Sequence, residues 1–121
     1  MSDKQYYIEF KEFMASYKKG LTDASDVGIA VCKLADHFVQ SNNAFTRSDI
    51  TYKLKCAEEE SKVDMNTGKP VSSTKAKVMA EASPSYEVMV NSECELKNVE
   101  VLLQSLKTLQ KGILGEVRNQ N

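Results

Sequence analysis

The sequence predicts a small all-α protein, a helical bundle with a long amphipathic C-terminal helix through which copies of the chain associate. Apolar residues recur at spacings of three and four along most of the chain, which is the period of a helix. The core-forming residues are mainly Leu, Val, Ile and Met, with no Trp and only four Phe. A length of 121 residues, 41% hydrophobic and 27% charged, is typical of one globular domain. We expect helices within 1–63, a loop at 64–73, and a short and then a long helix within 74–121.

The first predicted helix runs from Asp3 to about Lys19 and has an aromatic face. Lys18 and Lys19 lie where the helix dipole is negative, and Gly20 follows at the position that favours glycine. We expect the aromatic face to pack on the bundle or to receive a partner protein. Its residues are Tyr6, Phe10, Phe13, Met14 and Tyr17.

Two further helices are predicted before the loop. Thr22 or Asp23 caps the first of them, whose apolar stripe is followed by the polar run 40–43, where we expect the helix to end. The other begins at Thr46 or Ser48 and ends near Val63. Its apolar face is thin, and we expect the glutamates at 58–60 to form a solvated face. The two apolar stripes consist of Val27, Val31, Leu34 and Phe38, and of Ile50, Leu54 and Ala57.

The run DMNTGKPVSS at 64–73 has the composition of a loop, because Asn-Thr-Gly and Lys-Pro both interrupt regular structure. It is either a mobile linker or a functional loop. A short helix is predicted after it, from Thr74 to about Ala82. A single Gly68-Lys69 pair is far from a phosphate-binding glycine motif.

The long C-terminal helix has the strongest pattern in the chain. Ser83 is its predicted cap, Pro84 its first residue and Glu87 part of its first turn. It continues to about Arg118, roughly 50 Å at 1.5 Å per residue. Its heptad seam is buried either by the first helices or between chains, and the length and width of the seam favour burial between chains. The predicted oligomerisation residues are Met89, Leu96, Val99, Leu103, Leu106, Ile113 and Val117.

Composition argues against several classes of function. The net charge of −1 lacks the positive excess typical of nucleic-acid binders. Cys32, Cys56 and Cys94 form no CxxC pair and His37 is the only histidine, so we expect no metal and no cofactor. We interpret the cysteines as buried or half-buried thiols. No catalytic set is recognisable, and we expect a protein that is not an enzyme. Without a signal sequence or membrane span, we expect it in the cytoplasm.

A local basic excess predicts a weak nucleic-acid site. The segment from Arg47 to Lys77 contains seven basic and five acidic residues. Lysines near the loop would contact phosphates electrostatically, and an oligomer would repeat the patch and gain avidity. The alternative is an ordinary solvated charged face. The predicted DNA-binding residues are Lys53, Lys55, Lys62, Lys69, Lys75 and Lys77.

Two segments carry a resemblance to a known family. They are ITYKLKCAEEESKVDMNTGK and KAKVMAEASPSYEVMVNSECELKNVEVLLQSLKTLQKG, and together they cover about residues 50–112. Their order and spacing resemble the UvsY-like recombination mediators of bacteriophages. The resemblance implies a helical, ring-forming protein that binds the backbone of single-stranded DNA and helps to load a recombinase onto DNA covered by single-strand-binding protein. The matching basic positions are Lys53, Lys55, Lys62 and Lys69, with lysine where the family has arginine and with Glu58–Glu60 interrupting the basic run.

Two other functions remain open from the sequence. One is a protein-only interaction module, such as a phage-encoded inhibitor or adaptor that docks a helical face on a host protein. The other is a small assembly protein of a virion. Under each of these readings, as for a recombination mediator, we expect the chain in the cytoplasm of a bacterial host.

Overall fold

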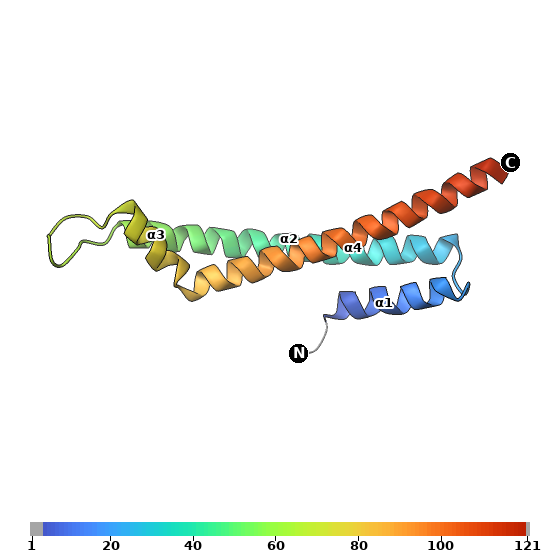
Figure 1. Ribbon diagram of the computed structural model, residues 1–121, viewed down its shortest axis with the longest axis horizontal. Coiled ribbons are helices and arrows are strands. Elements are labelled where there is room, and N and C mark those ends of the chain that lie inside the picture. The colour runs from blue at the N-terminus through green and yellow to red at the C-terminus, as the bar shows by residue number, and fades with distance from the viewer. Residues whose placement is uncertain (1–3, 121) are drawn as a thin grey trace. The chain divides into compact units, whose positions relative to one another are not determined.

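The computed structural model describes residues 4–120, and the side chains of residues 4–115. Over this range the chain forms four α-helices, and the predicted all-α fold is confirmed (Figure 1). They are α1 (Gln5–Lys18), α2 (Ala24–Glu60), α3 (Ser73–Glu81) and α4 (Pro84–Gln120). An isolated antiparallel bridge joins Val63 to Pro70 in the loop between α2 and α3.

The chain forms two compact units, where the sequence predicts one domain. Unit 1 consists of Met1–Gln40 and Lys97–Asn121, and unit 2 consists of Ser41–Leu96. Helices α2 and α4 have 37 residues each, which is about 55 Å at 1.5 Å per residue. Helices of that length extend beyond a single small core, so each contributes residues to both units.

The predicted break at residues 40–43 is wrong, because α2 continues through it to Glu60. No glycine or proline lies between Gly28 and Gly68, so nothing in the sequence forces the helix to stop. The polar side chains are accommodated within the helix itself. The Thr46 hydroxyl donates to the carbonyl of Asn42 at 2.9 Å, and the Ser48 hydroxyl donates to that of Ala44 at 2.8 Å.

The α1–α2 connection is fixed by hydrogen bonds at both helix ends. After α1, the Leu21 amide donates to the Ser16 carbonyl and the Gly20 amide to the Tyr17 carbonyl, both at 3.0 Å. This Schellman arrangement needs a positive φ at Gly20, which is +74°. Before α2, Asp23 and Asp26 cap each other's backbone amides at 2.9 and 3.0 Å. The predicted cap at Asp23 therefore begins the helix.

The core of unit 1 is built from α1, the first part of α2 and the last part of α4. It is apolar and closely packed, with Val99 at 0% and Leu106 at 1% exposure. Phe10, Phe13 and other half-buried residues pack around it. Its buried residues are Tyr6, Leu34, Val99, Leu103 and Leu106.

In unit 2 the second part of α2 packs against α3 and the first part of α4. The Ser48 and Ser92 hydroxyls are hydrogen-bonded at 3.1 Å, and the rings of Tyr52 and Tyr86 lie 5.2 Å apart. The buried residues of α3 are small, because Ala76 and Ala80 are essentially unexposed.

The loop of unit 2 is a closed turn between α2 and α3. The Asp64 amide donates to the Lys69 carbonyl at 2.8 Å, and the Gly68 amide donates back to the Asp64 carbonyl at the same distance. Gly68 has a φ of +69°, a conformation that favours glycine. Ser72 then caps α3 by accepting from the Lys75 amide at 3.2 Å. The loop is therefore held by its own backbone.

Candidate functional site

Two of the lysines predicted to bind DNA are tied to one buried carboxylate. The side chain of Glu59 accepts from Lys62 at 3.0 Å and pairs with Lys55 at 3.2 Å. Glu59 is only 5% exposed, although the sequence predicted a solvated glutamate face. Lys62, and then Lys55, donate hydrogen bonds to the Glu59 carboxylate, and these bonds hold the pKa of Glu59 below its ordinary value. Glu58 and Glu60 are exposed as expected.

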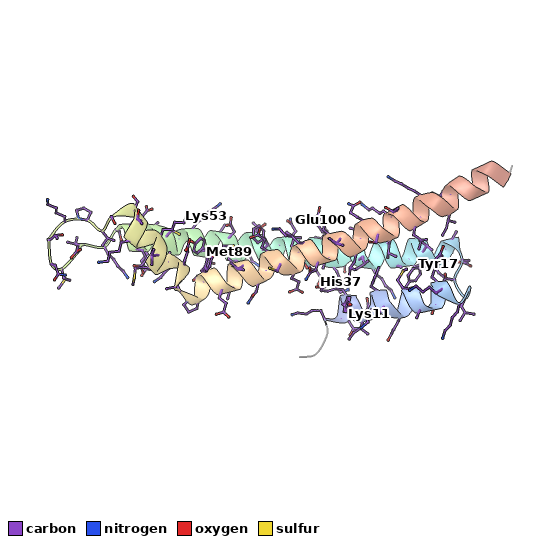
Figure 2. All side chains as sticks on the ribbon, in the orientation of Figure 1. Lys11, Tyr17, His37, Lys53, Met89 and Glu100 are labelled. Carbon is purple, nitrogen blue, oxygen red and sulfur yellow. The ribbon has the colours of Figure 1, made fainter. Side chains whose placement is uncertain are left out.

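Two more of these lysines have carboxylate partners at the surface. Lys53 pairs with Asp49 one turn earlier on α2 at 2.9 Å, and Lys75 on α3 pairs with Asp64 of the loop at 3.7 Å. Figure 2 shows Lys53 among the side chains along α2. Exposed pairs of this kind are weak, but each places a negative charge where a phosphate would have to bind.

Lys69 and Lys77 differ from the other four, because no carboxylate among the described side chains lies within ion-pair distance of either. Lys69 is on the loop and Lys77 on α3, and both are exposed. Residues 41–96 as a whole hold seven Lys and Arg against nine Asp and Glu. Unit 2 is therefore slightly acidic, and, within the described part of the chain, its positive charges without a carboxylate partner are those of Lys69, Lys77 and Arg47.

Three of the seven predicted oligomerisation residues are buried inside the single chain. Val99, Leu103 and Leu106 are at most 5% exposed, so the alternative of burial by the chain's own helices is the one that holds for these three. Their assignment to contacts between chains is corrected, because α1 and α2 already cover them. Met89, Leu96 and Ile113 are half-buried, and Val117 lies outside the described side chains.

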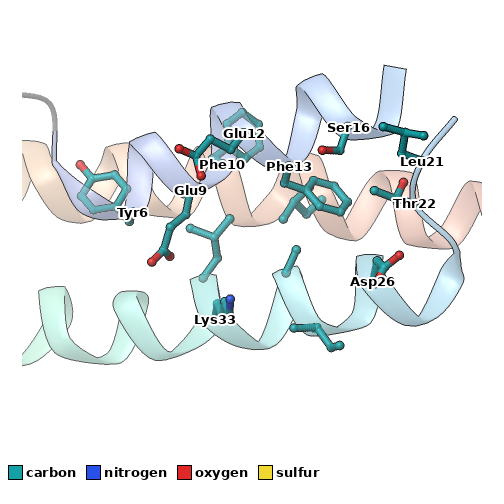
Figure 3. A pocket seen from close by; sticks show the side chains of 14 residues that line it. Tyr6, Glu9, Phe10, Glu12, Phe13, Ser16, Leu21, Thr22, Asp26 and Lys33 are labelled. Atoms are coloured by element: carbon teal, nitrogen blue, oxygen red, sulfur yellow. The ribbon is translucent and has the colours of Figure 1, made fainter. Parts of the chain in front are cut away.

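Unit 1 contains a groove among its described side chains. It has a volume of about 420 Å³ and is formed mainly by α1 and the first part of α2, as the close view in Figure 3 shows. Its walls are largely apolar, and Leu106 of α4 also contributes to its lining. Apolar grooves of this size with a few polar groups are the usual form of a binding site. The apolar lining consists of Tyr6, Phe10, Phe13, Leu21, Ile29, Ala30, Leu34 and Leu106.

Two apolar residues that line the groove are largely exposed to solvent and so do not belong to the core. Leu21 is 71% exposed in the α1–α2 connection, and Ile29 is 54% exposed on α2. Both lie on one hollow with half-buried phenylalanines, so they form a continuous apolar surface and not isolated exposed residues.

The charged residues of the groove are predominantly acidic. Glu9, Glu12 and Asp26 contribute three carboxylates against the single ammonium of Lys33. Glu9 lies 3.6 Å from His37, and Asp26 accepts from the Asp23 amide. The groove therefore favours a ligand that is apolar on one side and positively charged at its edges.

One polar atom in the lining lacks a hydrogen-bond partner. The Thr22 hydroxyl is buried and has no acceptor or donor within reach among the described residues. Buried polar groups are nearly always paired, so an unpaired one beside a groove is a position where a ligand's polar group would be stabilised.

The sequence indicated this surface only in part. The aromatic residues of the first helix predicted a face for the bundle or for a partner, and Phe10 and Phe13 lie in both the core and the groove. The roles of Leu21 and Ile29 were missed. An apolar residue directly after a helix-ending glycine frequently contacts its own helix, so no signal in the sequence indicated that Leu21 would be 71% exposed.

The cysteines differ from the sequence prediction in their exposure to solvent. Cys32 and Cys94 are exposed, which corrects their assignment as buried or half-buried, whereas Cys56 is half-buried. No group of three or more potential metal ligands is formed by the described side chains. None of the helices, over the part that the structure describes, has the length and apolar character needed to cross a membrane.

No protein-family model, curated protein or solved structure matches this chain.

Proposed function

We propose that this chain is a non-enzymatic interaction protein that holds a basic amphipathic helix of a partner protein in the groove of unit 1. The observation that carries the proposal is the combination of an apolar floor with an acidic edge in one hollow. Helices that present apolar residues on one face and basic residues at its borders bind such grooves.

The dimensions support a short helical ligand. Along α1 the lining extends from Tyr6 to Ser16, about 15 Å at 1.5 Å per residue, which corresponds to roughly three turns of a partner helix. Each fully buried apolar anchor of the partner contributes about 1.5–3 kcal/mol. Leu21 and Ile29 supply the exposed apolar surface, and Glu12 and Asp26 attract basic side chains at the edge.

A pair of designed peptides tests the proposal by fluorescence anisotropy. The probe is a fluorescent amphipathic helix of Leu and Lys, and the comparison peptide has Glu in place of Lys. We expect the Leu/Lys peptide to bind and the Leu/Glu peptide to bind at least tenfold more weakly, because the carboxylates of the groove repel it. Equal binding of the two peptides would contradict the proposal.

Two matched substitutions on α2 locate the binding surface. Ile29→Lys places a positive charge in the groove, whereas Val39→Lys makes the same kind of change outside the lining, at an equally exposed residue (54% and 55%). We expect only Ile29→Lys to weaken binding of the Leu/Lys peptide. If both variants bind as the wild type does, the groove is not the site.

Single-stranded DNA binding by unit 2 is a second candidate function. It follows from the resemblance to recombination mediators, and the observation that favours it is the lack of carboxylate partners at Lys69 and Lys77. Only these two of the six lysines offer phosphates an unpaired charge. Tyr52 and Tyr86 pack on each other, which favours contact with the backbone over base stacking.

Binding of a labelled oligothymidine at low and at moderate salt tests this candidate. We expect the double variant Lys69→Ala with Lys77→Ala to bind more weakly and with a flatter salt dependence, because fewer counterions are released. Lys53→Ala is the control, since Asp49 already pairs with that lysine. No binding by the wild type at low salt would eliminate the candidate.

A further inference from the structure

In unit 2, α2 has an apolar face that points away from its own partner helices. Ser48 and Tyr52 define the inner face, through their contacts with Ser92 and Tyr86 of α4. At about 100° per residue, Ile50 and Leu54 lie roughly 160° from Tyr52, one on either side of the point directly opposite. Ile50 is 54% and Leu54 67% exposed.

These two residues form a pair and are not scattered apolar positions. They lie four apart on one helix, where side chains are neighbours. Val101 of α4 is comparably exposed at 63%, but all residues three and four positions away from it are polar or charged. An isolated exposed valine needs no partner, whereas an exposed Ile–Leu pair presents a continuous apolar surface.

The charges that flank the pair are opposite at its two ends. Arg47 precedes Ile50 by one turn, and Glu58 follows Leu54 by one turn, so all four lie on the same outer part of α2. Both charged residues are exposed. No carboxylate among the described side chains is within ion-pair distance of Arg47, and Glu58 has only the nearby Lys55, at 3.4 Å.

We propose that this face of α2, from Arg47 to Glu58, pairs antiparallel with the same face of a second copy of the chain. Ile50 and Leu54 are equally spaced about Tyr52, so a two-fold axis there places Ile50 against the partner's Leu54 twice. It also brings each Arg47 within reach of the partner's Glu58. A face that is complementary to itself is what a two-fold contact requires.

Charge selects the antiparallel direction. In a parallel pair, Arg47 would lie beside the partner's Arg47 and Glu58 beside the partner's Glu58, and like charges on neighbouring helices are unfavourable. In the antiparallel pair both ends have an opposite charge across the interface. The four-residue pattern therefore specifies a second copy and its orientation.

The contact is small, and the dimer is therefore weak. Twelve residues of helix extend about 18 Å, so the area lies at the low end of specific interfaces. Association is concentration-dependent and uses neither the α4 seam nor the groove of unit 1. It goes beyond the proposed peptide binding, which is independent of it.

Sedimentation equilibrium of the full chain over a wide concentration range tests the pairing. We expect wild type to form dimers as concentration rises, and Ile50→Glu to raise the dimer dissociation constant at least tenfold, because the new carboxylate meets the partner's Leu54 and Glu58. Val101→Glu is the matched control and dimerises as wild type does. A wild type that is monomeric throughout, or a Val101→Glu variant that alone loses dimers, would overturn the proposal.

Charge exchange tests the orientation. Arg47→Glu weakens the antiparallel dimer, and adding Glu58→Arg to the same chain restores it, because both ion pairs reform with reversed sign. Circular dichroism verifies that each variant stays helical. Failure of the double variant to regain dimers rules out antiparallel pairing. Leu/Lys peptide binding by Ile50→Glu stays as in wild type, so this proposal and the groove proposal fail separately.

Discussion

Glu59 is the residue whose environment differs most from what its neighbours in the sequence suggest. Glu58, Glu59 and Glu60 are chemically identical, but only Glu59 lies on the inner face of α2 in unit 2. Its carboxylate is held by the ammonium groups of Lys62 and Lys55. A buried carboxylate keeps its charge only when such partners compensate for lost hydration.

The ion pairs of Glu59 make the stability of the protein dependent on pH in the acid range. The folded pKa is below the ordinary value of 4.5, so the unfolded chain binds a proton at a higher pH than the folded one. The stabilisation is therefore complete above 4.5 and is lost as the pH falls through the lowered value. We expect Glu59→Gln to lower the thermal midpoint at neutral pH and to reduce its fall on acidification.

Glu60→Gln is the matched control for this effect, because it removes the same charge from an exposed neighbour. Thermal denaturation followed by circular dichroism at neutral and at acid pH measures both variants. If Glu59→Gln and Glu60→Gln lose stability equally, the lysine pairs of Glu59 contribute nothing specific.

At the scale of the helices, the sequence predicted where helices begin and end better than it predicted that α2 continues without a break. The α1 end at Gly20, the α2 cap at Asp23 and the start of α4 at Pro84 all follow from residues with a strong local preference. The polar run at 40–43 has only a weak preference, and the inward-facing residues of α2 on either side keep the helix continuous. Composition alone therefore does not end a helix.

The same substitution, glycine to alanine, is expected to have opposite effects on stability at Gly20 and Gly112. Gly20 has φ +74°, where a Cβ is strained even though the surrounding space is open, so Gly20→Ala destabilises by about 1–2 kcal/mol. Gly112 lies within α4 with nothing near an added Cβ, so Gly112→Ala stabilises by about 1 kcal/mol.

Urea denaturation of the two glycine variants measures both changes against wild type. The sign is the informative result, because each variant gains the same methyl group. Stabilisation by Gly20→Ala would contradict the helix end described for α1.

At the scale of the whole chain, the sequence predicted the fold class but not which surfaces remain free. The heptad seam of α4 was recognisable, but periodicity does not say whether the apolar partner is another helix of the chain or another copy. Leu106 has its partners in α1 and α2 of the same chain. Among the exposed apolar residues are Leu21 and Ile29, which line the groove of unit 1, and the neighbouring pair Ile50 and Leu54 on α2.

For the candidate DNA site, too, the sequence predicted which residues are present but not which of them remain free. Counting charges between Arg47 and Lys77 gives a basic excess, but pairing depends on the helix face. Lys53 and Lys55 are two residues apart and so point about 160° apart around α2. Lys55 faces inward to Glu59, whereas Lys53 pairs with Asp49. A one-dimensional count therefore cannot identify which lysines remain unpaired.

The packed rings of Tyr52 and Tyr86 give unit 2 an optical reporter of its own. Removal from water, followed by the neighbouring Cys56, raises the pKa of Tyr52 from 10.0 to about 12. The chain has no tryptophan to mask tyrosine absorbance. The Tyr52 phenolate therefore forms only in strongly alkaline solution while α2 is packed on α4 at this position, and its formation at lower pH signals that these two helices have separated there.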